Sequence, residues 1–209
     1  MIVCIPRDGA VIFDLDGTLV DSSAVVERQW SIWARNHGIE PRVVMEVVHG
    51  RPSIQTMRMF VPETTLAESS AFDGIEAADL DGLKPVIGAR EAIDSCQRQQ
   101  ILWAIVTSGT LPMATNRLNV CRFPIPEIFV TVEQTERGKP APDPFLRAAM
   151  LLKIAPAKCT VFEDSAPGIH AGNAATMRVI ALRTTHSEDH LSGADAVVRD
   201  LSEVETRKE

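Results

Sequence analysis

The sequence predicts an α/β fold in which a parallel sheet is interrupted, near its start, by a block of helices. The first observation is an apolar run over residues 11–13 that ends in two acidic residues, Asp14 and Asp16. Such a run is typical of a strand that is buried on both faces of a parallel sheet. The second observation is that strand-like apolar runs alternate with helical patterns after residue 85. This alternation indicates crossover connections between parallel strands.

The third observation is that residues 21–80 show only helical periodicity. We expect four helices there: one through Val26, Trp30 and Trp33 that ends at Gly38, one that starts at Pro41, one around residues 54–60, and one from Pro62 to Leu80. The chain is therefore expected to form a core from residues 1–19 and 85–209, with a helical insertion, the cap, formed by residues 20–84.

The remaining core elements follow in order along the chain. Strands are expected at residues 101–107, which read as buried, at 128–132, 159–162 and 178–182, and at 195–198 as a last edge strand. Helices are expected at residues 89–99, 112–119, 143–153 and 167–175. The final residues, 206–209, are expected to fray.

Composition limits the possible functions. The chain has 209 residues and a formal net charge of −7, which argues against nucleic acid as a partner. No apolar stretch has the length of a membrane span, so no membrane partner is expected. The cysteines lack the spacing of a metal site and indicate a reducing, cytoplasmic compartment: Cys4, Cys96, Cys121 and Cys159. The sequence indicates no particular oligomeric state.

Asp14 and Asp16 are expected to lie close together. Residues two apart in a strand point to the same side, and ligands bind at the carboxyl ends of strands in open α/β sheets. Two adjacent carboxylates repel each other unless a cation lies between them. Because aspartate is also unfavourable in strands, this pair is predicted to serve a function rather than stability.

Two later segments carry groups that can bind phosphate. Thr107, Ser108 and Gly109 follow a predicted strand, where hydroxyl and backbone N–H groups can hold phosphate oxygens. Lys139 stands in a loop whose prolines restrict the backbone. Taken alone, the first segment is an ordinary turn and the second an ordinary solvated lysine.

A third segment supplies further carboxylates. Glu163 and Asp164 end another apolar strand. Together with Asp14 and Asp16 they provide oxygen ligands that suit Mg²⁺. The order of all these segments, rather than any one of them, indicates a functional site.

The segments resemble, in the same order, the four motifs of the haloacid dehalogenase (HAD) superfamily of phosphohydrolases, beginning with residues 13–19. The resemblance implies a HAD-like Rossmannoid core and a Mg²⁺-dependent phosphomonoesterase. Asp14 would be the nucleophile that forms an aspartyl-phosphate, and Asp16 the general acid and then the base. Thr107 and Lys139, with the turn at Ser108 and Gly109, would bind the phosphoryl group.

The same resemblance implies the ligands of the metal ion. Mg²⁺ would be held by Asp14, by the backbone carbonyl of Asp16 and by Asp164. Glu163 would either ligate the ion or orient it through water.

The insertion resembles the helical cap found in one subgroup of this superfamily. Residues 25–35 and 103–109 are also similar to bacterial sugar phosphatases that act on hexose and hexitol phosphates. His49 and Arg51 resemble a His-Gly element of sugar-phosphate and glycerol-phosphate phosphatases, although a plain helix end would also explain them. The resemblance implies that these two residues contact a small phosphorylated sugar or polyol.

Two other functions stay open from the sequence. A β-phosphoglucomutase would share the fold and the cap, but those enzymes carry a cap histidine ten positions after the acid/base aspartate, where this chain has Val26. A non-enzymatic binding module would be expected to have lost a catalytic position, and none is lost. Dehalogenases and phosphonatases lack the second aspartate, which is present here as Asp16.

Overall fold

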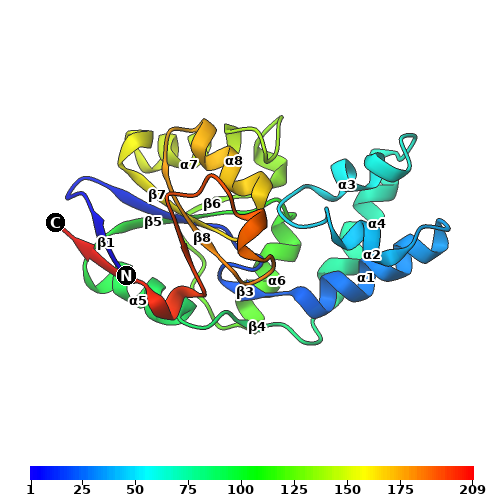
Figure 1. Cartoon of the computed structure of the whole chain (residues 1–209), viewed down its shortest axis with the longest axis horizontal. Coiled ribbons are helices and arrows are strands. Elements are labelled where there is room, and N and C mark those ends of the chain that lie inside the picture. Colours follow the sequence, from blue (N-terminus) through cyan, green and yellow to red (C-terminus); the bar gives the residue numbers. More distant parts are fainter.

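A six-stranded parallel sheet forms the centre of the molecule in the computed structural model, which describes residues 1–209 (Figure 1). The strand order is β6-β5-β2-β7-β8-β9. The strands span Ala10–Phe13 (β2), Leu102–Val106 (β5), Ile128–Val130 (β6), Cys159–Glu163 (β7), Arg178–Leu182 (β8) and Ala196–Val198 (β9). Because β2 lies between β5 and β7, the carboxyl ends of these three strands are neighbours at one edge of the sheet.

Helices cover both faces of the sheet. Val11 and Phe13 of β2 belong to one apolar cluster with residues of α5 and α6, whereas Ala10 and Ile12 belong to a second cluster with residues of α7 and α8. This alternation follows from the two-residue period of a strand. The helices span Ala89–Arg98 (α5), Leu111–Val120 (α6), Asp143–Leu152 (α7) and Ala166–Ala174 (α8). The predicted α/β class is confirmed.

A group of four helices stands beside the sheet and forms the cap (Figure 1). They span Ser23–Asn36 (α1), Pro41–Met45 (α2), Ser53–Phe60 (α3) and Leu66–Ala78 (α4). The chain enters and leaves this group through two short antiparallel strands, Val20–Asp21 (β3) and Lys84–Pro85 (β4). The cap has its own apolar cluster, in which the rings of Trp30 and Phe72 lie 4.6 Å apart. No helix in the structure combines the length and apolar character needed to cross a membrane.

Two local predictions are wrong. The helix expected from Pro62 begins at Leu66, because Thr65 and Glu68 form a capping box that fixes the first turn there. The expected fraying of residues 206–209 is also wrong. The strand β10 (Glu205–Lys208) pairs in parallel with β1 (Ile2–Ile5), and Thr206 is buried in this pair.

Candidate active site

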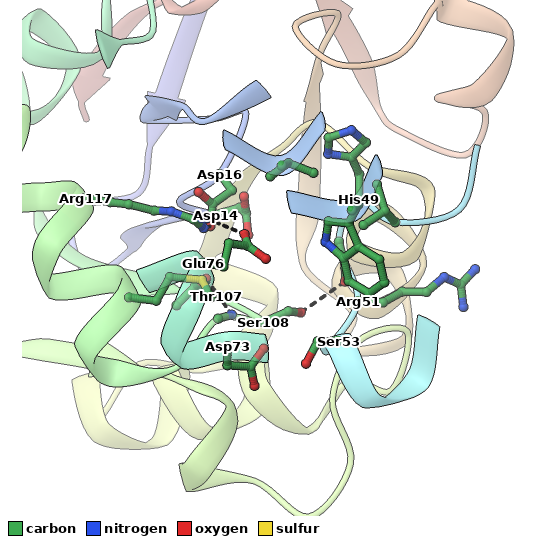
Figure 2. Close-up of a pocket in the computed structure, with 16 residues that line it drawn as sticks. Asp14, Asp16, His49, Arg51, Ser53, Asp73, Glu76, Thr107, Ser108 and Arg117 are labelled. Carbon is green, nitrogen blue, oxygen red and sulfur yellow. Dashed lines mark hydrogen bonds and ion pairs between the residues drawn. The ribbon is translucent and has the colours of Figure 1, made fainter. Parts of the chain in front are cut away.

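The predicted core residues of the site meet where β2, β5 and β7 end. Figure 2 shows Asp14, Asp16, Thr107 and Ser108 of this group. Asp14 follows β2 directly, Thr107 follows β5, and Asp164 follows β7. Lys139 enters from the loop before α7 and hydrogen-bonds the carboxylate that follows β2. Segments that are more than a hundred residues apart in the sequence thus converge on one edge of the sheet.

Lys139 is completely buried and lies between two carboxylates. Its Nζ donates to Oδ1 of Asp14 at 2.5 Å, to Oε1 of Glu163 at 2.7 Å and to the carbonyl oxygen of Val106 at 3.3 Å. Burial alone lowers the pKa of Lys139, but Asp14 and Glu163 together raise it above its usual value. The ammonium is therefore charged and fixed next to the Asp14 carboxylate.

Glu163 connects Lys139 to the backbone at the start of α8. Its Oε2 accepts hydrogen bonds from the backbone N–H groups of Asp164 and Ser165 at 2.7 Å each, and from Oγ of Ser165 at 2.8 Å. Ser165 also caps α8 by accepting from the backbone N–H of Gly168. A Cβ at Gly168 would come within 1.7 Å of the Glu163 carboxylate, so a glycine is required at that position.

The carboxylates form a group that suits a divalent cation. Ligand oxygens of Asp14, Glu163 and Asp164 lie within 4.8 Å of one another, and all three residues are buried. Burial raises the pKa of Asp14 to about 8 against the opposing effect of Lys139, and Glu163 adds to the rise. Burial also raises the pKa of Asp164. Three carboxyl groups that face a single ammonium therefore tend to retain protons, and Mg²⁺ with its preference for oxygen ligands would hold Asp14 and Asp164 in their ionised forms.

Gly17 allows the first and last motifs to approach closely. Its φ is +81°, and a Cβ there would come within 2.1 Å of Oδ2 of Asp164. That same carboxylate oxygen accepts a hydrogen bond from Oγ1 of Thr185, which lies in the loop after β8. Thr185 was not predicted as a site residue, because a threonine in a loop carries no distinctive pattern.

The turn after β5 faces the cavity next to Asp14. Oγ1 of Thr107 accepts from the backbone N–H of Gly109 at 3.0 Å, which fixes the turn. Ser108 donates its Oγ proton to the carbonyl oxygen of Gly50 in the cap at 3.0 Å. Thr107, Ser108 and Gly109 all line the cavity, as a phosphate-binding turn would.

The cap closes over these groups and leaves only a small cavity. Its volume is about 70 Å³, whereas small-molecule sites usually measure about 300–1,000 Å³. Apart from the two connecting strands, three hydrogen bonds join core and cap: Ser108 to Gly50, Asn116 to the carbonyl oxygen of Ala77, and Arg117 to Glu76. A substrate larger than a few atoms therefore requires the cap to move.

His49 and Arg51 both line the cavity from the cap side. Burial lowers the pKa of His49 to about 4, with a further lowering by His186 and an opposing effect of Asp16. The ring of His186 lies 5.2 Å from that of His49. The guanidinium of Arg51 extends away from Asp14 and Asp16 (Figure 2), and its Nε has no hydrogen-bond partner in the protein.

Four polar residues of the cavity wall were not predicted: Ser53, Asp73, Glu76 and Arg117. Arg117 of α6 contacts Oδ2 of Asp16 at 2.7 Å and Oε1 of Glu76 at 2.6 Å. A signal for both ion-pair partners was present in the sequence. Glu76 lies four residues after Phe72 on the buried face of α4, and Arg117 shares the buried face of α6 with Met113. A charge on the apolar face of a helix is the pattern that would have identified them.

Family models and relatives agree with this geometry. Residues 9–176 match the haloacid dehalogenase-like hydrolase family. The chain belongs to that family and is an enzyme of the hydrolase class. The predicted superfamily is therefore confirmed.

Two curated relatives match over nearly their whole length. The chain is 40% identical to Hexitol phosphatase A of Escherichia coli (strain K12), over 95% of this chain and 94% of the relative. It is 31% identical to 2-deoxyglucose-6-phosphate phosphatase 2 of Saccharomyces cerevisiae, over 94% and 89%.

Solved structures share the fold. A hydrolase from Pseudomonas syringae superposes with a TM-score of 0.83 at 24% identity, covering 93% of this chain and 94% of the other. A β-phosphoglucomutase from Clostridium difficile gives a TM-score of 0.81 at 20% identity, covering 93% and 92%. Both therefore share the overall α/β fold of this chain.

Proposed function

We propose that this enzyme is a Mg²⁺-dependent phosphomonoesterase that hydrolyses a small sugar or polyol phosphate. The observation that carries the proposal is the buried Asp14–Lys139 pair, which faces a cap-covered cavity with Asp16 two residues further along the chain. The 40% identity to a hexitol phosphatase over almost the entire chain supports the substrate class.

In the first step, a carboxylate oxygen of Asp14 attacks the phosphorus atom, and the bond to the substrate's ester oxygen breaks. Asp16 donates its proton to that oxygen, so the sugar or polyol leaves as a neutral alcohol. In the second step, water attacks the aspartyl-phosphate while Asp16 takes up a proton from the water. Inorganic phosphate leaves, and the Asp14 carboxylate and the protonated Asp16 are restored.

Electrostatics explains why Lys139 must lie beside the nucleophile. A carboxylate and a phosphate oxygen in contact repel by about 4 kcal/mol at an effective dielectric constant near 20. The Nζ of Lys139 offsets part of that repulsion, and the Thr107 hydroxyl and the backbone after it hold the other phosphoryl oxygens. Phosphate monoesters hydrolyse extremely slowly without a catalyst, so each of these contacts matters.

Asp14, Asp164 and the backbone carbonyl of Asp16 would hold the metal ion. When bound, Mg²⁺ supplies positive charge that stabilises the transferring phosphoryl group. Both oxygens of Glu163 are engaged by Lys139 and by the start of α8. We therefore assign Glu163 to positioning Lys139 rather than to direct ligation.

The cap favours hydrolysis over transfer to a second sugar. Val26, at the position of the mutase histidine, is buried and lines the cavity with Trp30. An apolar side chain cannot bring a second hydroxyl to the aspartyl-phosphate by hydrogen bonding. Water is therefore the acceptor, and the cap groups that contact the hydroxyls of the leaving alcohol are His49 and Arg51, with Ser53 and Asp73 beside them in the cavity wall. A cytoplasmic location, inferred from the cysteines, remains a prediction.

A panel of phosphorylated hexitols, hexoses, deoxyhexoses and glycerol tests the proposal. We expect release of inorganic phosphate with Mg²⁺, and a rate about 10³-fold lower in excess chelator, because the metal contributes several kcal/mol to the transition state. Readdition of Mg²⁺ should restore the rate. No release from any member of the panel, or an unchanged rate in chelator, would contradict the proposed function.

A further inference from the structure

Arg117 connects the cap to the carboxylate assigned as acid and base. It projects from α6 of the core, and its side chain is 4% exposed. One terminal nitrogen contacts Oδ2 of Asp16 at 2.7 Å, and the other contacts Oε1 of Glu76 at 2.6 Å. The fork of the guanidinium thus joins one carboxylate from the core and one from the cap (Figure 2).

Arg117 restrains Asp16 through only one of the two oxygens of its carboxylate. Only Oδ2 is held by Arg117, whereas Oδ1 is buried without a hydrogen bond to the protein. Asp16 also lines the cavity. One oxygen of the carboxylate is therefore anchored, and the other makes no hydrogen bond to the protein that would compete with proton transfer. Proton transfer needs such a fixed approach, since a displacement of about 1 Å can cost roughly 10²-fold in rate.

The other side of the guanidinium links Asp16 to the position of the cap. Glu76 is buried on α4. The other two hydrogen bonds between core and cap are formed by Ser108 and Asn116, and neither residue hydrogen-bonds Asp16. The 70 Å³ cavity requires the cap to move when substrate enters. If α4 moved away with the cap, Arg117 would lose Glu76 and would no longer be held from both sides. Closure would then restore the anchor of Asp16.

We propose that Arg117 is a positioning residue that aligns Asp16 for proton transfer only while Glu76 of the closed cap holds it. The inference rests on the proposed function, because it concerns the acid and base of that reaction. In this proposal neither Arg117 nor Glu76 contacts the substrate. The cap would thereby switch on the chemistry as well as cover it.

Pre-steady-state kinetics with p-nitrophenyl phosphate separates the two steps. p-Nitrophenolate leaves without needing a proton, so transfer to Asp14 stays fast when Asp16 is misaligned. Attack by water still needs Asp16. For Arg117→Ala we expect a burst of about one p-nitrophenol per site, followed by a steady-state rate lowered by about 10- to 100-fold. On the best sugar phosphate, kcat should fall about as much while KM changes by less than about threefold.

Conservative variants and a matched control sharpen the test. Arg117→Lys keeps the charge but loses the fork, and Glu76→Gln keeps the size but loses the charge, so both should show smaller bursts and losses of about 3- to 30-fold. Asn116→Ala removes the neighbouring hydrogen bond from α6 to the cap, at Ala77, without touching Asp16. It should show no burst and a kcat within about threefold of wild type.

The outcomes separate this inference from the proposed function. Wild-type protein that releases no phosphate contradicts the proposed function. Active wild type with no burst in Arg117→Ala, Arg117→Lys and Glu76→Gln contradicts only the role of Arg117. A burst of equal size in Asn116→Ala also contradicts it, since cap closure alone would then explain the effect. If Arg117→Ala does not fold, as judged by circular dichroism, the two conservative variants decide the question.

Discussion

The core side and the cap side of the cavity are built in different ways. On the core side, Asp14, Lys139, Glu163 and Asp164 are at most 5% exposed and tied to one another or to backbone groups. On the cap side, the polar groups that line the cavity are mostly part-exposed and make few contacts: His49, Arg51, Ser53 and Asp73. Reaction chemistry needs fixed charges. Substrate contacts need only donors and acceptors on helices that can move, so the cap is free to vary.

The largest effect is expected from a substitution of the nucleophile on the core side. Asp14→Asn should lower turnover by at least about 10⁴-fold on every monoester, because an amide oxygen cannot form the acyl-phosphate. The assay is phosphate release under single-turnover conditions, with thermal unfolding as a check that the variant is folded. Retention of more than about one hundredth of the wild-type rate would show that another residue is the nucleophile.

The next effect concerns proton transfer. Asp16→Asn should lower the rate by about 10²–10⁴-fold on an alkyl phosphate, whose alcohol is a poor leaving group. Transfer of the phosphoryl group from p-nitrophenyl phosphate to Asp14 should be affected least, because its leaving group needs no proton. The measurement is the burst amplitude compared with the steady-state rate. Near wild-type turnover of the alkyl phosphate would remove Asp16 from the acid/base role.

The same contrast explains how far sequence reasoning reached. Asp14, Thr107 and Asp164 directly follow β2, β5 and β7, so the strand pattern predicted that they lie at or near strand ends, and the order of the four motifs predicted that they form one site. The position of Lys139 followed from the family resemblance, since a loop lysine carries no local signal. The α/β class followed from the alternation of patterns after residue 85.

The contacts between core and cap could not be predicted in the same way. Arg117 and Glu76 are 41 residues apart in the sequence and lie on different helices. Nothing in the local sequence specifies which faces of α4 and α6 meet. The pairing of β1 with β10 was missed for a similar reason, because its strands come from opposite ends of the chain. β1 is apolar but only four residues long, and three of the four residues of β10 are charged, so β10 does not stand out by hydrophobic pattern.

A smaller effect tests the cap side. His49→Ala or Arg51→Ala should lower kcat/KM for the best sugar phosphate by roughly 10- to 100-fold, since one lost hydrogen bond in a closed site costs about 1–3 kcal/mol. p-Nitrophenyl phosphate has no sugar hydroxyls, so its kcat/KM should hardly change. The ratio of the two losses is the measured quantity. Arg42→Ala removes an exposed arginine of the cap that does not line the cavity, and serves as the control.

Equal losses on both substrates would instead indicate a general defect of the cap. No loss on either would remove that residue from the specificity site. This outcome would be less surprising for Arg51 than for His49, because the Arg51 guanidinium extends away from the carboxylates in the closed structure (Figure 2). It would have to turn toward the sugar once the cap has opened and closed on a substrate.

The smallest effect is on stability and comes from the partial burial of His49 between cap and core. Its pKa is lowered to about 4, first by burial and then by His186, whereas an unfolded histidine titrates near 6.5. Between these values the unfolded chain binds more protons at His49 than the folded chain does. The free energy of unfolding therefore falls as pH drops through this window, and is unaffected by His49 above it.

For this reason wild type should lose about 1 kcal/mol more than His49→Gln between roughly pH 7.5 and pH 5.5. For a chain of this size, that equals a difference of about 2–4 °C in the shift of Tm. The comparison between the two proteins cancels the titration of the buried carboxylates, which both contain. His170→Gln, an exposed histidine on α8, is the control and should follow wild type. Parallel pH profiles for wild type and His49→Gln would show that His49 is protonated as readily in the folded protein as in the unfolded chain, and hence that the cap does not bury it in solution.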